Sequence, residues 1–163
     1  DMSRGLGDVY KRQLLAEDKP EEALKVFSDV INESQDQMSA ALAQYDARIG
    51  RAQCLQKLTR YEEAAKMLES VIEALPEEQS LVLAQAWNQL GECRREQDQP
   101  RAALLAYLHV DILYSDVARE HAEALHYLGP LWTAAGHPDR ARDVQSRLKQ
   151  EYPGSRWARE AEN

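Results

Sequence analysis

Apolar residues recur along the chain at three- and four-residue intervals, which is the spacing of one face of an α-helix. Residues 87–91 and 125–129 show this most clearly, because each combines a large apolar residue, a leucine and a glycine on one face. Short polar breaks follow such segments at residues 17–19, 59–60, 98–99 and 136–137. The pattern predicts helices separated by tight turns.

Each break is followed by a four-residue motif that ends on alanine. A large apolar residue lies four positions beyond that alanine in three of the four cases, at Phe27, Leu68 and Tyr107, whereas the fourth case has Gln145. Proline suits the first turn of a helix because its missing N–H would have no partner there. The motifs therefore open second helices, and the predicted unit is helix, turn, helix. They are Pro20-Glu21-Glu22-Ala23, Tyr61-Glu62-Glu63-Ala64, Pro100-Arg101-Ala102-Ala103 and Pro138-Asp139-Arg140-Ala141.

The repeated positions resemble the consensus of the tetratricopeptide repeat in its bacterial form. The matching residues are Trp87, Leu90, Gly91, Ala103 and Tyr107, with Pro76 and Pro153 in neighbouring units. The resemblance implies an all-α fold, a right-handed superhelical solenoid of about four helix-turn-helix repeats. These repeats would span about residues 14–37, 38–77, 78–116 and 117–154, with a capping helix starting in 155–163. The spacing between repeats is longer than in the family, and the first repeat keeps only a remnant of its opening helix.

The two ends of the chain carry further resemblances. Residues 8–13 resemble the translated adapter end of transposase-based sequencing libraries, so we expect residues 1–13 not to be native and exclude them from fold reasoning. Residues 152–161 resemble a junction of bacterial cell-envelope members of the superfamily, including outer-membrane assembly lipoproteins and Tol-Pal coordinators. Ser155 is predicted to cap a new helix there.

Composition narrows the possible functions. The net charge of −8 argues against binding to nucleic acid or to anionic membranes, and no apolar run is long enough for membrane insertion. Cys54 and Cys93 form no CxxC motif. His121 and His126 are five residues apart on a helix and cannot share a metal ion as an i, i+4 pair could, so we expect surface or partly buried histidines. We predict no enzyme activity and no catalytic, cofactor-binding or metal-binding residues.

The resemblance also implies where a partner would bind. In this family the first helices of the repeats line a concave face that holds a peptide or a partner's helix. The two-carboxylate clamp of the chaperone-binding members is absent, because its positions carry Ile49, Gln53 and Glu123. The predicted partner-binding residues on this face are Ile49, Gln53, Gln56, Asn88, Glu92, Arg95, Glu123 and His126.

The predicted function is a non-catalytic scaffold for contacts between proteins. Two alternatives stay open at this point, a periplasmic cell-envelope assembly factor and the regulatory repeat region of a larger enzyme. The sequence leaves the compartment, cytoplasmic or periplasmic, and the identity of the partner protein or peptide open.

Overall fold

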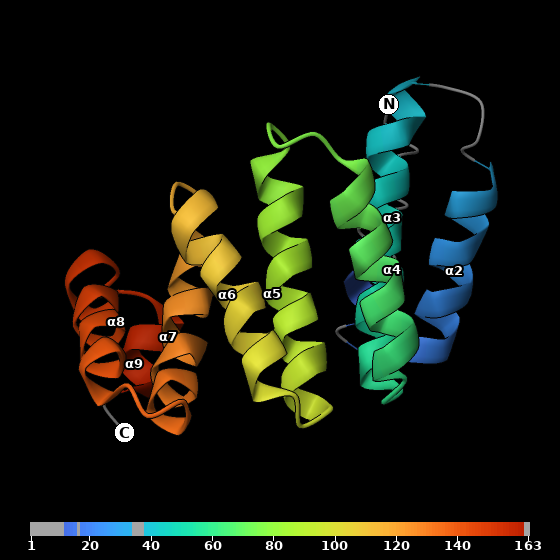
Figure 1. Ribbon diagram of the computed structural model, residues 1–163. Helices are drawn as coiled ribbons and strands as arrows, with labels where there is room; N and C mark the ends of the chain where they lie inside the picture. Colours follow the sequence, from blue (N-terminus) through green and yellow to red (C-terminus); the bar gives the residue numbers. More distant parts are fainter. Residues whose placement is uncertain (1–11, 16, 34–37, 162–163) are drawn as a thin grey trace. The chain divides into compact units, whose positions relative to one another are not determined.

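The computed structural model describes residues 12–15, 17–33 and 38–161, and these residues form helices and turns (Figure 1). The helices are α2 (Pro20–Glu33), α3 (Met38–Lys57), α4 (Tyr61–Ala74), α5 (Ser80–Glu96), α6 (Pro100–Leu113), α7 (Ala118–Ala134), α8 (Pro138–Glu151) and α9 (Arg156–Glu160). The chain divides into two compact units, Asp1–Val71 and Ile72–Asn163. The all-α prediction is confirmed, and the predicted second helices begin at Pro20, Tyr61, Pro100 and Pro138.

The turns inside the repeats share one backbone geometry. Asp18, Thr59, Asp98 and Gly136 each have a positive φ, and each lies two residues before the next helix begins. At the third turn the N–H of Gln99 donates to the carbonyl of Arg94 at 2.8 Å, and the other turns repeat this bond. The bond satisfies a carbonyl that the end of a helix would leave unpaired. A residue with positive φ and the same backbone hydrogen bond, from an N–H to the carbonyl five residues earlier, occur at four equivalent positions. The turn therefore belongs to a repeated unit.

Small residues let the paired helices approach closely. A Cβ atom added at Gly91 in α5 would lie 2.7 Å from the ring of Tyr107 in α6, which is too close for a real contact. Gly50 in α3 faces the ring of Phe27 in α2 in the same way. At Gly129 in α7 the facing side chain is Gln145, and the added Cβ would lie 3.3 Å from its Nε2 atom. The tight approach is therefore kept in two pairs and relaxed in the α7–α8 pair.

Each unit has its own apolar core. In the first unit Leu14, Ala23, Phe27, Ala47 and Cys54 form a buried cluster between α2 and α3. In the second unit the largest fully buried side chains come from all four long helices, α5 to α8, and they are Cys93, Tyr107, Val110, His121, Leu125, Leu128 and Leu148. Here α5 pairs with α6, α7 pairs with α8, and α7 also contacts α5, α6 and α9. Helix α7 is thus the centre of the second unit.

Two further predictions concern the ends of the chain. The Ser155 cap is confirmed, because the N–H of Ala158 donates to Oγ of Ser155 at 3.1 Å at the start of α9. Residues 1–11 lie outside the described residues, so the adapter hypothesis for residues 1–13 stays a prediction.

Candidate binding surface

One side of the second unit is formed by α5, α7 and α9, and α7 contacts both of the other helices. We call it the α5–α7–α9 surface and define it by Glu92 and Arg95 of α5, Glu123, His126 and Tyr127 of α7, and Trp157 of α9. All six side chains are half-buried. They are therefore held by the fold and still reach solvent, as binding residues must.

Aromatic rings hold these three helices together. The guanidinium of Arg95 lies 4.1 Å from the ring centre of Tyr127, and its Nε atom lies 3.4 Å from the hydroxyl of Tyr107. Tyr127 and His126 both contact Trp157 of α9, with ring centres 5.5 and 5.0 Å apart. Edge-on and tilted ring contacts and a cation over an aromatic face fix side-chain positions at little further cost in entropy. This half of the surface is consequently preorganised.

Two carboxylates on the same surface have no directly bonded partner among the described residues. Glu92 of α5 and Glu123 of α7 form no ion pair or hydrogen bond within the part of the chain that the structure describes. Burial raises the pKa of Glu123 to about 7, and the negative charges of Glu92 and Glu120 act in the same direction, against Arg119 and Arg156. Burial also raises the pKa of Glu92. Charged acids in a partly dehydrated position are costly unless something pairs with them.

A pocket of about 460 Å³ opens beside Glu123, between the start of α7 and α9. Ala118 and Ala122 contribute apolar surface to it, and Tyr152 and Trp157 contribute aromatic rings. Its polar lining residues are Arg119, Glu123, Ser155 and Arg156. Arg156 is already paired with Glu160 at 2.9 Å. The pocket has the dimensions and the mixed lining to receive one large side chain of a partner.

A polar network joins α6, α7 and α8, and it shares Tyr152 with this pocket. Nε2 of His121 lies 2.7 Å from Oδ1 of Asp111, and Nδ1 of His121 lies 2.6 Å from the hydroxyl of Tyr152. Arg147 of α8 donates two hydrogen bonds to Asp111, at 2.7 and 3.1 Å. Burial alone would raise the pKa of Asp111, but the hydrogen bonds from His121 and Arg147 outweigh it and lower this pKa to about 2.

In this network both ring nitrogens of His121 and both carboxylate oxygens of Asp111 have hydrogen-bond partners. His121 is only 1% exposed, so the prediction that it lies at or near the surface is wrong. Its two ring nitrogens hold Asp111 and Tyr152 in place. The sequence signal that could have found the network is Asp111 itself, a lone acid within the apolar sequence of α6.

The eight predicted partner-binding residues fall into three groups. Ile49, Gln56 and Asn88 are buried and offer almost no surface, which corrects their placement on an open face. Asn88 instead donates from Nδ2 to the backbone carbonyl of Glu120 at 2.9 Å and ties α5 to α7. Gln53 of α3 is exposed, in the first unit. The structure brings the other four together on the α5–α7–α9 surface, and they are Glu92, Arg95, Glu123 and His126.

Sequence reasoning missed the residues that complete this surface. Tyr127 and Trp157 supply its aromatic contacts, and Arg119 and Arg156 line the pocket beside Glu123. Among the described residues no group of His, Cys, Asp and Glu has the arrangement of a metal site. None of the described helices combines the length and apolar content that a membrane span requires.

Comparison with known families agrees with the geometry. Residues 14–87, which contain α2, α3, α4 and the first part of α5, match the family model of the tetratricopeptide repeat. A comparison with curated proteins gave no match. Tetratricopeptide repeats generally mediate contacts between proteins, and α5–α8 continue the same helix-turn-helix plan. The matched part of the chain, residues 14–87, is therefore similar to tetratricopeptide repeats.

Proposed function

We propose that this protein is a non-catalytic scaffold that binds a peptide segment or helix of a partner protein along the α5–α7–α9 surface. The observation that carries the proposal is that Glu92 and Glu123 are half-buried, while neither has an ion pair or a hydrogen bond within the described residues. Partly dehydrated acids without partners lower the stability of the free protein, and a cation supplied by a partner offsets that cost. The partner segment therefore carries a lysine or arginine that lies between these two carboxylates.

The pocket beside Glu123 adds a second requirement. Its alanines and aromatic rings favour a large apolar side chain. Aromatic residues already held by Arg95 and by one another need little reordering when a partner arrives. The partner segment thus combines a basic residue with an apolar anchor nearby in space.

Selection from a random peptide library on the full chain, followed by calorimetric titration of the selected peptides, tests the proposal. We expect selected peptides to be enriched in basic residues that neighbour an apolar residue. Glu123→Gln and Glu92→Gln should each weaken binding about tenfold, which corresponds to one charged hydrogen bond. Glu73→Gln is the matched control, since Glu73 is an exposed acid of α4, and it should leave the affinity unchanged.

The pH dependence separates this mode of binding from a general attraction to an acidic protein. Because the pKa of Glu123 is raised to about 7, pairing with a cation expels its proton, and affinity should rise between pH 6 and pH 8. The rise should disappear in Glu123→Gln. Selected peptides that bind the two glutamine variants as tightly as the native chain would overturn the proposal.

A further inference from the structure

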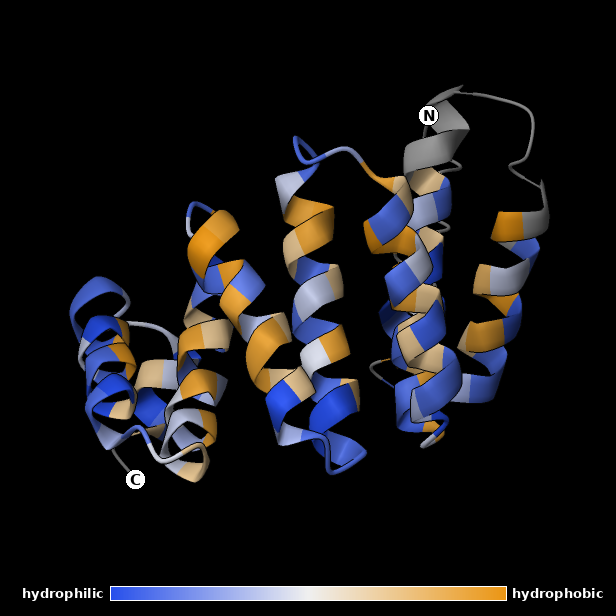
Figure 2. Cartoon of the chain, in the orientation of Figure 1, coloured by the Kyte–Doolittle hydropathy of each residue, from blue (hydrophilic) through white to orange (hydrophobic). Residues whose placement is uncertain are grey.

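The outward side of α6 carries apolar residues where a helix in a soluble protein usually carries charges. Leu105 and Ile112 are 60% and 70% exposed, and the neighbouring Leu113 is 58% exposed. Arg101, Leu105, Leu108 and Ile112 follow one another at four-, three- and four-residue steps, so they form one stripe along the helix. Figure 2 shows hydrophobic residues along much of α6. We call these four residues the α6 stripe.

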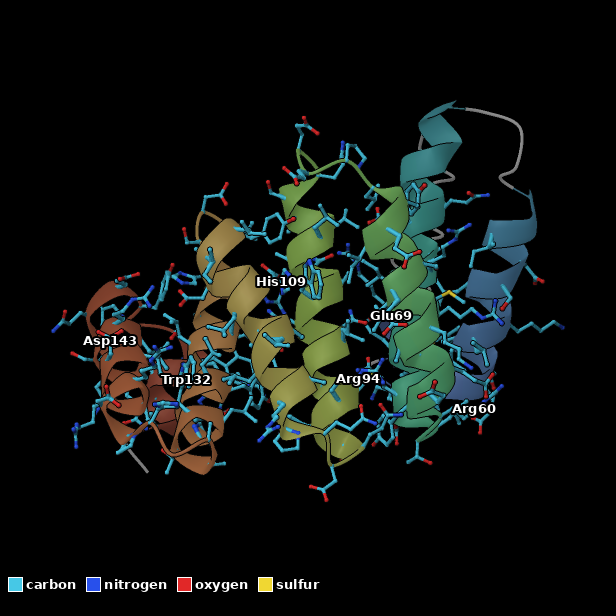
Figure 3. The ribbon with its side chains drawn as sticks, viewed as in Figure 1. Arg60, Glu69, Arg94, His109, Trp132 and Asp143 are labelled. Carbon is cyan, nitrogen blue, oxygen red and sulfur yellow. The ribbon has the colours of Figure 1, made fainter. Side chains whose placement is uncertain are left out.

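Nothing charged interrupts the α6 stripe after Arg101. The acid of this helix, Asp111, points to His121 and Arg147 and takes no part in the outward side. His109 lies beside the stripe and stacks on Trp87 of α5, with ring centres 3.8 Å apart (Figure 3). Beyond Arg101 the stripe is therefore an uncharged, apolar surface on a firmly packed helix, and an apolar helix is the partner that suits it.

The α6 stripe is complementary to itself when a second copy runs in the opposite direction. The midpoint between Leu105 and Ile112 falls between Leu108 and His109, so a twofold axis there places each Leu105 opposite the other copy's Ile112. Arg101 and Asp116 are equally distant in sequence from the same midpoint. Both are exposed, and neither has an ion pair or hydrogen bond with another described residue. A cation thus lies at the start of the stripe, and an anion lies in the turn that follows α6.

We propose that two copies of this chain associate through antiparallel contact of their α6 stripes, with Arg101 of each copy beside Asp116 of the other. A twofold interface needs one surface that fits itself, which the order of cation, apolar centre and anion provides. Four large side chains on each copy form a small interface, so the dimer is weak and reversible. The proposal is independent of the proposed function, because none of these residues belongs to the α5–α7–α9 surface.

Sedimentation velocity of the full chain over a wide concentration range tests the association. We expect the mass to rise from the 18.6 kDa monomer toward the dimer as concentration increases. Leu105→Glu, which buries a new charge in the interface, should abolish this rise. Leu81→Glu is the matched control, because Leu81 of α5 is 56% exposed and lies outside the stripe. It should leave the rise unchanged, and circular dichroism should show both variants folded.

A charge exchange tests the antiparallel arrangement. Arg101→Glu and Asp116→Lys should each weaken the dimer, because each places two like charges opposite one another. The double variant restores opposite charges and should dimerise as the native chain does. A native chain that stays monomeric at every concentration, or a dimer that Leu105→Glu leaves intact, would overturn the proposal. A double variant weaker than both single variants would overturn it as well.

Discussion

Asp111 and Glu123 are both partly buried acids of the second unit, yet their surroundings differ completely. Asp111 receives hydrogen bonds from His121 and Arg147, and its pKa is lowered to about 2. Glu123 has no partner among the described residues, and its pKa is raised to about 7. The first acid joins α6, α7 and α8, whereas the second stays available on the α5–α7–α9 surface. The comparison shows that pairing, and not burial alone, separates a structural acid from one suited to binding.

Removal of each acid should change stability in opposite directions. Asp111→Ala leaves His121 and Arg147 without their shared acceptor and should lower the free energy of unfolding by about 3 kcal/mol. Glu123→Gln should keep or raise the stability at pH 7, because it removes a dehydrated charge. Urea denaturation followed by circular dichroism measures both, with the exposed Asp139→Ala as control. Similar losses in the two variants would contradict the comparison.

The contribution of Asp111 should also depend on acid pH. Its pKa in the folded chain lies below its ordinary value of 3.8, so its contribution is complete above that value and disappears as the pH falls through about 2. The difference in unfolding free energy between the native chain and Asp111→Asn should shrink by about 2 kcal/mol between pH 5 and pH 2. A difference that is constant over this range would show that the hydrogen bonds do not favour the charged form.

Glu123 should show the reverse dependence at higher pH. Its folded pKa is raised above the ordinary 4.5, so an unfolded chain releases this proton first. The stability of the native chain should therefore fall as the pH rises from about 4.5 to about 7. We expect this fall to amount to about 2 kcal/mol at most, since the side chain is partly exposed. Glu123→Gln should lack it, and an identical profile in both proteins would contradict the raised pKa.

Much of the repeat plan was predictable from the sequence because it depends on local rules. Proline at the first turn and a small residue opposite a large one act within a single helix pair, as at Pro100, Gly91 and Tyr107. The lone acid Asp111 of α6 could have indicated a buried polar contact, but its partners His121 and Arg147 were not predictable, since they depend on how far α6 and α8 are shifted along α7. The periodicity of apolar residues indicates which face of a helix is buried, but it does not indicate how far one helix is shifted along its neighbour.

The candidate surface was predicted only in part for a related reason. An inner helix packs against neighbours on both sides, so its exposed strip is narrow. Asn88 and Glu92 lie one turn apart on α5, yet Asn88 is 2% exposed and bonded to α7, whereas Glu92 reaches solvent. Trp157 was missed because its ring contacts depend on the position of the short helix α9. In such a helix, two residues can therefore lie on the same face and still differ in how exposed their side chains are.

The α7–α8 pair has looser packing at its glycine than the α5–α6 pair, and this difference can be measured. Substitution of Gly91 and of Gly129 by alanine compares the two helix pairs directly. An added Cβ at Gly91 meets the fully buried ring of Tyr107, so Gly91→Ala should destabilise the protein by about 1 to 2 kcal/mol. Gln145 is exposed and can move away from Gly129. Gly129→Ala should therefore gain up to about 1 kcal/mol from helix propensity. Thermal unfolding measures both, and equal signs would mean that the two pairs are packed alike.

The smallest expected effect concerns a single hydroxyl. Tyr152→Phe removes the group that lies 2.6 Å from Nδ1 of His121 and should cost about 1 kcal/mol, because the buried nitrogen is left without a partner. Tyr127→Phe is the matched control on the α5–α7–α9 surface. It keeps the ring contacts with Trp157 and Arg95, so its effect should stay within about 0.5 kcal/mol. Equal losses would mean that the hydroxyl of Tyr127 is also hydrogen-bonded, and the α5–α7–α9 surface would then be as fully paired as the network at His121.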